Sequence, residues 1–369
     1  CTFDARAWRG AVDCVIGGFP CFVAGTSILT RSGYRPIESL QIGDVVLTHS
    51  GNWKPVTSVM RRNGARLRVV RGTGMLATTT TDEHPYYVRT RAEKWDNTSR
   101  RYKRQFSEPQ WIDASKLDGC HFTGQVLPAE KPDERGESFW WLVGRYLADG
   151  WMVDRAGRKN GRVVICANES ESQLLAQRIK DAGFIASCVP EKTVNKFHIT
   201  RGDFYEFLAE FGRLAHGKTL PGWCLELPQS SARALFDGWS SGDGWRNEKQ
   251  QNVSVTTVSK ELALGMALLA QRAFGRVANI YFADMPAKCR IDGRTVNQRG
   301  QYTVRVCDRN RSSFVDGGYG WRLVRGNESA GHGDVFNISV ADDESYIANG
   351  SIVHNCQDLS LAGKRAGLD

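Results

Sequence analysis

The sequence lacks any hydrophobic run long enough to span a membrane. Its most apolar windows are short and interrupted by arginine, aspartate or glycine, whereas a membrane-spanning helix needs about 20 consecutive apolar residues. It also lacks Cys-x-x-Cys pairs, although it contains 10 cysteines. Such pairs are typical of zinc ribbons, and clustered cysteines of disulfide-rich secreted domains, so neither class is indicated. We therefore expect a cytoplasmic protein with no membrane partner and mostly reduced, buried cysteines.

The overall composition is ordinary for a soluble globular protein. The chain has 369 residues, of which 41% are hydrophobic and 24% charged, enough for two or three domains. Its net charge of +9 is compatible with nucleic-acid binding without requiring it. The chain begins with Cys1 rather than methionine, and both of its ends lie inside motifs, so we expect a fragment of a longer protein.

Two short strings recur in the middle of the chain at the same separation. Asp-Gly-Trp occurs at 149–151 and 243–245, and Leu-Leu-Ala-Gln-Arg occurs at 174–178 and 268–272, so both copies are 94 residues apart (149 to 243 and 174 to 268). Unrelated strings that recur at one separation indicate a duplicated unit. The sequence predicts such a unit of strands and helices over roughly residues 138–310.

In each repeat, Asp-Gly-Trp follows an apolar segment that predicts a helix ending near the glycine. Both segments carry small residues at i, i+4 spacing, which lets two helix backbones approach closely. These residues are Gly144, Ala148, Gly238 and Gly242. If the helices cross there, Asp149 and Asp243 converge, and two carboxylates that close repel each other unless a cation lies between them. Hard oxygen ligands of this kind suit Mg²⁺.

The segments Leu-Val-Gly-Arg-Tyr-Leu-Ala-Asp-Gly at 142–150 and Phe-Asp-Gly-Trp-Ser-Ser-Gly-Asp-Gly at 236–244 resemble the LAGLIDADG homing endonucleases. The resemblance implies an α+β domain over 136–310 with two αββαββα halves, acting as a monomer with internal pseudo-twofold symmetry. It also implies a β surface in the major groove of double-stranded DNA, Asp149 and Asp243 holding the metal ions for strand cleavage, and Lys218 as an active-site lysine. The alternatives are that both aspartates merely cap helices, or that the nuclease has decayed.

Three further segments are candidates for DNA contact. In 196–201 and 302–309, polar and basic residues alternate with apolar ones, so one face of each predicted strand would point toward the groove. The stretch 89–104 holds seven basic residues against two acidic ones. It either grips phosphates or forms a solvated loop.

Short predicted strands lie on both sides of the repeat, at 26–30, 36–48 and 335–340. Four motifs accompany them: Cys-Phe-Val-Ala-Gly-Thr from Cys21, Gly-Asp-Val at 43–45, Thr-Asp-Glu-His-Pro at 81–85, and the segment from Val335 to His-Asn-Cys at 354–356. In this order they resemble the signature blocks of an intein that covers residues 21–355. The resemblance implies a multidomain protein: an all-β, horseshoe-shaped Hint splicing domain, residues 21–135 and 311–355, with the endonuclease inserted.

The first chemical step of splicing needs a nucleophile at the start of the insert. The thiol of Cys21 can attack the carbonyl of Pro20 to give a thioester. His84 can protonate the leaving nitrogen, and Thr81 can position the scissile carbonyl or stabilise its oxyanion. Cys356 then attacks the thioester and forms a branched intermediate. We expect no cofactor for this chemistry.

Asn355 completes the excision, because its side-chain nitrogen can close on its own carbonyl to form a succinimide. His354 can protonate the leaving amine or polarise the carbonyl, and a final S-to-N shift joins the two flanks. Two positions depart from the usual intein pattern: Asn337 stands where an acidic residue or cysteine is usual, and Glu344 where histidine is frequent. We hypothesise that Glu344 serves as a general base.

The flanks, residues 1–20 and 356–369, resemble a DNA (cytosine-5) methyltransferase around its Pro-Cys-Gln nucleophile motif. An intein-free methyltransferase allele is then the expected DNA target, and the short flanks alone should not methylate DNA. Two rival interpretations stay open. One is a DNA-binding remnant that has lost splicing or cleavage. The other is a hedgehog-like autoprocessing domain, which gives no role to the His-Asn-Cys string or to the repeat.

Overall fold

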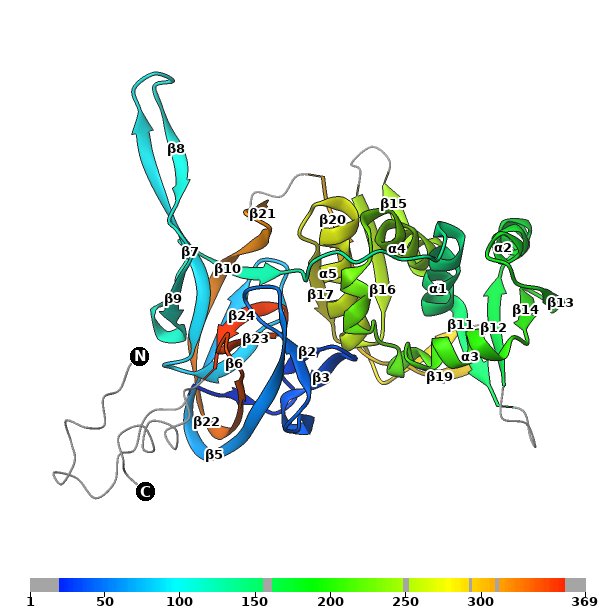
Figure 1. The fold of residues 1–369 in the computed structure, drawn as a ribbon, viewed down its shortest axis with the longest axis horizontal. Helices are drawn as coiled ribbons and strands as arrows, with labels where there is room; N and C mark the ends of the chain where they lie inside the picture. The colour runs from blue at the N-terminus through cyan, green and yellow to red at the C-terminus, as the bar shows by residue number, and fades with distance from the viewer. Residues whose placement is uncertain (1–19, 155–160, 248–251, 292–293, 309–311, 356–369) are drawn as a thin grey trace.

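The computed structural model describes residues 20–154, 161–247, 252–291, 294–308 and 312–355. Its elements form two parts that lie next to each other along the longest axis (Figure 1). Strands from both ends of the described chain build one part, and the middle of the chain builds the other. None of the helices among these residues combines the length and the apolar character needed to cross a membrane.

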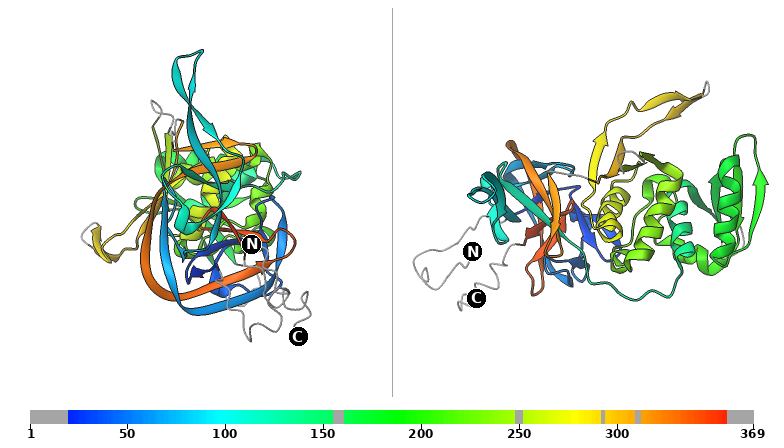
Figure 2. Two further views of the ribbon diagram at one scale, coloured as in Figure 1. Left: turned by 90° about the vertical axis from the view of Figure 1, so that its left-hand side faces the viewer. Right: turned by 90° about the horizontal axis from the view of Figure 1, so that it is seen from above.

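The first part is a 14-stranded β structure assembled from two separate stretches of sequence. Its strands are β1 (Phe22–Val23), β2 (Ser27–Thr30), β3 (Gly33–Pro36), β4 (Val45–Leu47), β5 (Trp53–Gly72), β6 (Thr78–Thr81), β7 (Pro85–Asp96), β8 (Arg101–Phe106), β9 (Gln110–Asp113), β10 (His121–Val126), β21 (Ser313–Asp316), β22 (Tyr319–Val340), β23 (Ser345–Ala348) and β24 (Ser351–His354). The long strands β5 and β22 pair antiparallel and curve around the shorter ones (Figure 2). The all-β prediction is confirmed.

The first and last strands of this part carry the sites predicted at its two ends. β1 is held on both sides, because it pairs with β6 and with β22. β24 pairs with β23 and with β7. β6 ends at Thr81 and β7 begins at Pro85, so the short turn between them joins the two neighbourhoods.

The second part contains the repeat. Its elements are α1 (Glu137–Asp149), β11 (Gly150–Val153), β12 (Arg162–Ala167), α2 (Glu169–Asp181), β13 (Ala186–Pro190), β14 (Asn195–Ile199), α3 (Gly202–Ala209), α4 (Gln229–Asp243), β15 (Gly244–Asn247), β16 (Asn252–Thr257), α5 (Lys260–Phe274), β17 (Asn279–Ala283), β18 (Lys288–Ile291), β19 (Arg294–Asn297) and β20 (Gln301–Val306). Both halves run helix, strand, strand, helix, strand, strand, as the repeat predicts. Each half has a four-stranded sheet, in the orders β11-β12-β14-β13 and β15-β16-β20-β17.

The two halves differ in how they end. The first half ends with α3. In the second half the hairpin β18–β19 is inserted between β17 and β20, and it stands away from the body of the molecule (Figure 2). After β20 the described chain continues into β21 of the first part rather than into a third helix.

The first helices of the two halves, α1 and α4, cross at their small residues. A methyl group added to Gly144 would lie 2.0 Å from the carbonyl oxygen of Leu235, and one added to Gly238 would lie 2.0 Å from that of Trp141. No side chain larger than hydrogen fits at such distances, so the two backbones touch. The predicted close crossing is confirmed, and it brings the C-terminal ends of the two helices together.

The two parts share one hydrophobic core. The largest cluster of buried apolar side chains combines residues of the helical part with Leu29, Tyr34, Leu47, Ile347 and Ile352 of the β part. Polar contacts reinforce the junction: the guanidinium of Arg322 is buried and donates to the carbonyl of Ala278 at 2.5 Å. The inserted part is therefore packed against the β part and not merely tethered to it.

The basic stretch 89–104 forms a projecting hairpin. β7 extends beyond the sheet and pairs with β8, so that this arm stands well clear of the rest of the β part (Figure 1). Trp95 and Tyr102 face each other across it and remain largely exposed. The solvated-loop alternative is thus replaced by an ordered two-stranded arm.

Candidate functional sites

The start of β1 forms the first candidate site, where the backbone of Cys21 is clamped on both sides. Its amide nitrogen donates to Oγ1 of Thr81 at 3.1 Å. Its carbonyl oxygen accepts hydrogen bonds from Oγ1 of Thr80 at 2.8 Å and from the amide of Thr81 at 3.0 Å. Cys21 itself is buried. Thr81 therefore contacts the nitrogen side of the Pro20–Cys21 bond.

His84 lies directly beside this strand. Its ring is completely buried, and its centroid is 4.1 Å from that of Phe22. Neither ring nitrogen makes a well-aligned hydrogen bond among the described residues, although the backbone of His354 lies near enough to oppose part of the fall in the pKa of His84. Burial, helped by the charge of His354, lowers the pKa of His84 to about 3, so the ring is neutral. A buried, neutral imidazole with open donor and acceptor positions is expensive to maintain, which is typical of a functional group.

The turn that carries His84 is held by hydrogen bonds from a neighbouring loop. The amide of Ala114 donates to the carbonyl of His84 at 2.8 Å, and the amide of Ser115 donates to the carbonyl of Asp82 at 2.9 Å. The carboxylate of Asp82 also accepts a hydrogen bond from Nε of Arg68 at 2.9 Å. The ring of His84 is therefore positioned by its backbone.

Asn337 lies on β22 opposite this site. β1 pairs with β22 in the register Phe22 to Phe336 and Val23 to Val335, so the next opposed position to Cys21 is Asn337. Opposed residues on neighbouring strands point to the same face. Oδ1 of Asn337 accepts from the hydroxyl of Tyr346 at 2.7 Å, and its buried Nδ2 has no partner among the described residues.

A second constellation forms at the end of β24. Nδ1 of His354 lies 2.6 Å from the carbonyl oxygen of Asn355. The backbone amide of Asn355 donates to the carbonyl of Glu344 at 2.8 Å. In the orientation that satisfies both ends of its carboxamide, Nδ2 of Asn355 donates to the same carbonyl at 2.7 Å, and its oxygen accepts from the amide of Val340 at 2.8 Å. The side chain of Asn355 is thereby fixed from both sides.

Glu344 contributes a second group to this constellation. Its carboxylate lies 4.0 Å from Nε2 of His354, and its backbone has a left-handed φ of 47°, which is unfavourable for a residue with a side chain. The structure thus brings together three predicted residues, His354, Asn355 and Glu344. Cys356, the fourth, lies outside the described residues.

His49 was not predicted from the sequence, yet it belongs to this neighbourhood. Its Nδ1 lies 2.7 Å from Oγ of Ser345, and Ser345 is paired with His354 across β23 and β24. The indole of Trp111 contacts both imidazoles, at centroid distances of 5.7 Å and 4.9 Å. Burial lowers the pKa of His49, and the positive charge of His354 adds to that effect. No local pattern marks His49, because its partner is 296 positions away in the sequence.

The third candidate site lies where α1 and α4 end. Asp149 is the last residue of α1, and Asp243 is the last residue of α4. Burial and, to a smaller extent, the neighbouring carboxylate of Asp149 together raise the pKa of Asp243 to about 6. Burial also raises the pKa of Asp149, against the opposing charges of Arg145 and Lys218. The predicted convergence of the two carboxylates is therefore present.

Lys218 is buried between the two aspartates and the end of α1. Its Nζ donates to the carbonyls of Tyr146, Leu147 and Ala148 at 2.8, 2.9 and 3.2 Å. These carbonyl groups lie in the last turn of the helix, where positive charge is favoured; that of Tyr146 also accepts the cap amide of Gly150. Burial lowers the pKa of Lys218 to about 8, although the charges of both aspartates oppose that shift.

Arg145 is a second cation that the sequence patterns did not single out. It is buried within α1, and its Nη2 lies 3.1 Å from Asp149 and 2.7 Å from Glu171. The carboxylate oxygens of Asp149 and Asp243 suit a hard divalent ion such as Mg²⁺. The raised pKa of Asp243 also shows that this pair gains from a nearby positive charge.

The sheet of the first half carries a groove on its outer face. The groove has a volume of about 400 Å³, and Arg162, Lys196 and His198 are among its lining residues. Phe197 and Ile199, which alternate with them on β14, are buried instead. The predicted alternation is therefore present over 196–199, whereas Thr200 and Arg201 lie beyond β14 and are both exposed.

Comparison with known proteins agrees with this geometry. Residues 20–77 match the family model described as "Hint domain", and residues 230–312 match the model described as "LAGLIDADG-like domain". The chain contains a Hint domain and a LAGLIDADG-like domain. The Hint match begins at Pro20 and Cys21, and the LAGLIDADG-like match includes α4 with Asp243.

Similar proteins carry unrelated names. The chain is 26% identical to an ATP-dependent DNA helicase Hel308 of Thermococcus kodakarensis, over 99% of this chain and 39% of the helicase. It is 25% identical to an iron-sulfur cluster assembly SufBD family protein of Mycobacterium tuberculosis, over 91% of this chain and 43% of that protein. It therefore spans about two fifths of the length of these relatives. Among solved structures, I-DmoI in complex with DNA and Ca aligns with a TM-score of 0.32 and 14% identity, covering 46% of this chain and 82% of that chain.

Proposed function

We propose that this chain is an intein that excises residues 21–355 and joins its flanks, and that its LAGLIDADG-like domain cleaves double-stranded DNA. The observation that carries the first proposal is the pair of junction sites within one Hint domain, with Cys21 clamped beside His84 and Asn355 clamped beside His354. The relatives support it. A helicase and an iron-sulfur assembly protein match nearly the whole chain over less than half of their own length, as an element inserted into unrelated hosts would.

The domain boundaries proposed for this element follow the sequence expectation. The Hint domain comprises residues 21–135 and 311–355, and the endonuclease comprises 136–310. In support, β10 ends at Val126 and α1 starts at Glu137, while β20 ends at Val306 and β21 starts at Ser313. We further propose that the protein acts in the cytoplasm as a monomer, with α1 and α4 related by a pseudo-twofold axis.

The first step forms a thioester at Cys21. The sulfur attacks the carbonyl carbon of Pro20, a carbon–sulfur bond forms, and the carbon–nitrogen bond breaks. The neutral ring of His84 accepts the thiol proton and returns it to the leaving nitrogen of Cys21. A pKa of about 3 keeps the ring neutral before the reaction, so that a ring nitrogen has a lone pair with which to accept the proton. Thr81 accepts the amide hydrogen of Cys21 and so orients the scissile peptide.

The second step transfers the acyl group from Cys21 to the thiol of Cys356 and yields the branched intermediate. Asn337, opposed to Cys21 across the strand pair, offers an amide donor where other inteins usually carry an acid or a thiol. An amide accepts no proton from an attacking thiol. We therefore assign Asn337 the role of orienting the junction rather than that of a base.

The third step cuts the bond after Asn355. Its Nδ2 attacks its own carbonyl carbon, a succinimide forms, and the amine of Cys356 leaves with the proton that Nδ2 loses. His354 donates from Nδ1 to the carbonyl oxygen and polarises it. The backbone carbonyl of Glu344 holds Nδ2, and the carboxylate of Glu344 lies 4.0 Å from Nε2 of His354, where it can orient the ring. An S-to-N shift at Cys356 then restores a peptide bond. None of these steps uses a cofactor.

Double-strand DNA cleavage is the second proposed activity, supported by the converging carboxylates of Asp149 and Asp243. These two residues would hold Mg²⁺, which would supply Lewis acidity at the phosphate. Lys218 stabilises charge between the two carboxylates, and the groove lined by Arg162 and Lys196 positions the duplex through its phosphates. The proposed target is the intein-free methyltransferase gene, because the flanking segments resemble that enzyme.

A DNA-binding remnant is the alternative that specific residues favour. Position 337 carries asparagine where an acid or a thiol is usual, which disfavours splicing. Arg145 already pairs with Asp149, so this carboxylate is neutralised without a metal ion. The hedgehog-like interpretation is less well supported, since it leaves the clamped carboxamide of Asn355 without a role.

Intact-mass measurement of the chain expressed between two tags tests the splicing proposal, beside Cys21→Ala and Asn355→Ala variants. Ligated flanks plus a free fragment of residues 21–355, absent in both variants, is the expected result. Full-length precursor in all three samples would refute splicing. For the nuclease, a plasmid with the rejoined host site should be linearised only when Mg²⁺ is present; an intact plasmid under both conditions would favour the remnant.

A further inference from the structure

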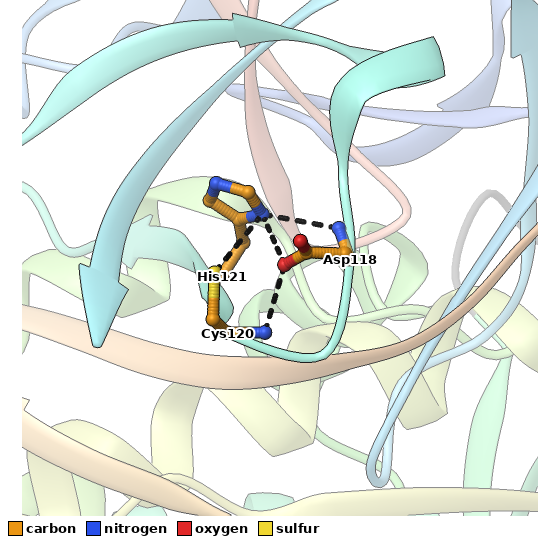
Figure 3. Close-up of side chains that lie close together, drawn as sticks. All are labelled: Asp118, Cys120 and His121. Atoms are coloured by element: carbon orange, nitrogen blue, oxygen red, sulfur yellow. Dashed lines mark hydrogen bonds and ion pairs between the residues drawn. The ribbon is translucent and has the colours of Figure 1, made fainter. Parts of the chain in front are cut away.

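A loop outside both proposed active sites gathers three different metal-binding side chains. Asp118 and Cys120 lie in the short connection that leads into β10, and His121 is the first residue of that strand (Figure 3). One donor atom from each residue lies within 4.8 Å of the other two. Nδ1 of His121 is 2.8 Å from Oδ1 of Asp118 and 3.9 Å from Sγ of Cys120.

The backbone of this loop fixes the cluster. The amide of His121 donates to the carbonyl of Asp118 at 3.1 Å, which closes a tight turn. The amide of Cys120 donates to Oδ1 of Asp118 at 2.8 Å. The side chain of His121 is only 9% exposed, whereas that of Asp118 is 63% exposed. The imidazole is therefore locked in place, and the cluster opens to solvent on the carboxylate side.

The hydrogen bonds of the cluster leave two acceptors facing each other. The amide of Asp118 donates to Nδ1 of His121 at 3.0 Å, so this nitrogen presents its lone pair there. Yet a carboxylate oxygen of the same aspartate lies 2.8 Å from the same nitrogen. A lone pair and a carboxylate oxygen repel at that distance unless a proton or a cation lies with them. A bound cation resolves this conflict.

We infer that Asp118, Cys120 and His121 form a binding site for a zinc-class divalent cation. A thiolate, an imidazole and a carboxylate form a mixed set of donors that favours Zn²⁺ over Mg²⁺ or Ca²⁺, which prefer oxygen ligands. Metal–ligand bonds of about 2.0–2.3 Å in a tetrahedral site separate the ligands by about 3.3–3.6 Å. The observed separations of 2.8 and 3.9 Å lie on either side of that range. The fourth position faces solvent and would hold water.

The site shares no residue with the proposed splicing and nuclease sites, but it follows closely in the chain on a turn that supports the first junction. The 3-10 turn Ala114–Lys116 precedes it in the chain, and the amide of Ala114 is the donor to the carbonyl of His84. An ion bound at Asp118 would therefore stiffen the support of that histidine.

Cobalt titration of the full chain tests the inference, in a Cys21→Ala, Asn355→Ala background that cannot splice. Co²⁺ should bind one equivalent with a thiolate-to-cobalt charge-transfer absorption, and Zn²⁺ should displace it. Cys120→Ser should abolish that absorption, and Asp118→Asn should weaken binding by about tenfold or more. Cys188→Ser is the matched control, because Cys188 is an exposed cysteine on β13 and should leave the spectrum unchanged.

Circular dichroism of each variant establishes that it is folded. An unchanged cobalt spectrum in the folded Cys120→Ser variant would overturn the inference. So would the absence of any charge-transfer absorption in the folded parent, which would leave the cluster as a hydrogen-bonded turn that binds no metal.

Discussion

Nδ1 of His354 is hydrogen-bonded to the carbonyl oxygen of Asn355 at 2.6 Å, while the carboxylate of Glu344 lies 4.0 Å from the other nitrogen of the same ring. The imidazole thus links an acid to the carbonyl that Asn355 attacks in the proposed mechanism. This relationship lets the two halves of the splicing reaction be tested separately.

Replacing His354 with alanine should slow cleavage after Asn355 by about 10²- to 10⁴-fold, the usual range for a lost acid–base group. The measurement is the rate at which the C-terminal flank is released in a Cys21→Ala background, where only this step occurs. Thiol-induced cleavage at Cys21, measured in an Asn355→Ala background, should be unaffected. Equal losses at both junctions would point to a folding defect.

The carboxylate of Glu344 should act through His354, so Glu344→Gln and Glu344→Ala should both accumulate the branched intermediate. Both changes keep the backbone carbonyl that holds Nδ2 of Asn355. Asp342→Asn is the control, since Asp342 lies in the same turn with a similar φ of 61° but pairs with Lys54. Gel and mass analysis of splicing time courses measures the intermediate; unchanged kinetics would remove Glu344 from the mechanism.

The buried ring of His84 should make the protein less stable in acid. Its pKa is about 3 when folded and 6.5 in the unfolded chain, so between these values the unfolded state binds a proton that the folded state excludes. Stability should therefore fall as the pH is lowered from 6.5 toward 3. Urea unfolding of the Cys21→Ala precursor across this range, with and without His84→Gln, measures the effect. The variant should lose part of the pH dependence, and identical slopes would contradict the assignment.

The rate of DNA cleavage should depend on pH through the ionisation of Asp243. Its pKa of about 6 means that the carboxylate forms only as the pH rises through that value, so cleavage should increase across pH 5–7. Asp243→Asn should abolish cleavage of target plasmid while leaving splicing intact. Cleavage that persists in this variant would exclude Asp243 from the nuclease site.

The crossing of α1 and α4 should tolerate no added methyl group. Gly144→Ala would place a carbon 2.0 Å from the carbonyl oxygen of Leu235, so we expect destabilisation of about 1–3 kcal/mol or more. Gly217→Ala is the matched control, because nothing lies within 4 Å of the added methyl and its backbone is compatible with alanine. Thermal and urea unfolding compare the two variants.

The predictions from the sequence were most accurate where a short sequence pattern determines the geometry of a helix or strand. Small residues at i, i+4 spacing on two helices were enough to predict the crossing, and the crossing in turn predicted that Asp149 and Asp243 meet. Alternation on β14 likewise predicted which of its side chains are buried and which lie on the more exposed face. Each of these predictions started from a pattern a few positions long, and the repeat showed that the helix pattern occurs twice, 94 residues apart (149 to 243).

Features built from distant residues could not be predicted in the same way. His49 reaches its partner Ser345 across 296 positions, and the shared core joins Leu29 to Ile347. No local pattern records such contacts, since they arise only when the β structure closes. The arm formed by β7 and β8 was also missed, because the residues at its tip, 97–100, carry no glycine to mark a tight turn.

The shared core limits how far this protein can be shortened by deletion. Removing the middle of the chain would expose Leu29, Tyr34 and Leu47, together with Ile347 and Ile352 on the strands that lead to Asn355. A shortened version made by deletion alone should therefore aggregate and be poorly soluble. The strands that position Asn355 should also be distorted. Polar side chains at those five positions should be needed to obtain a compact protein-ligation tool from it.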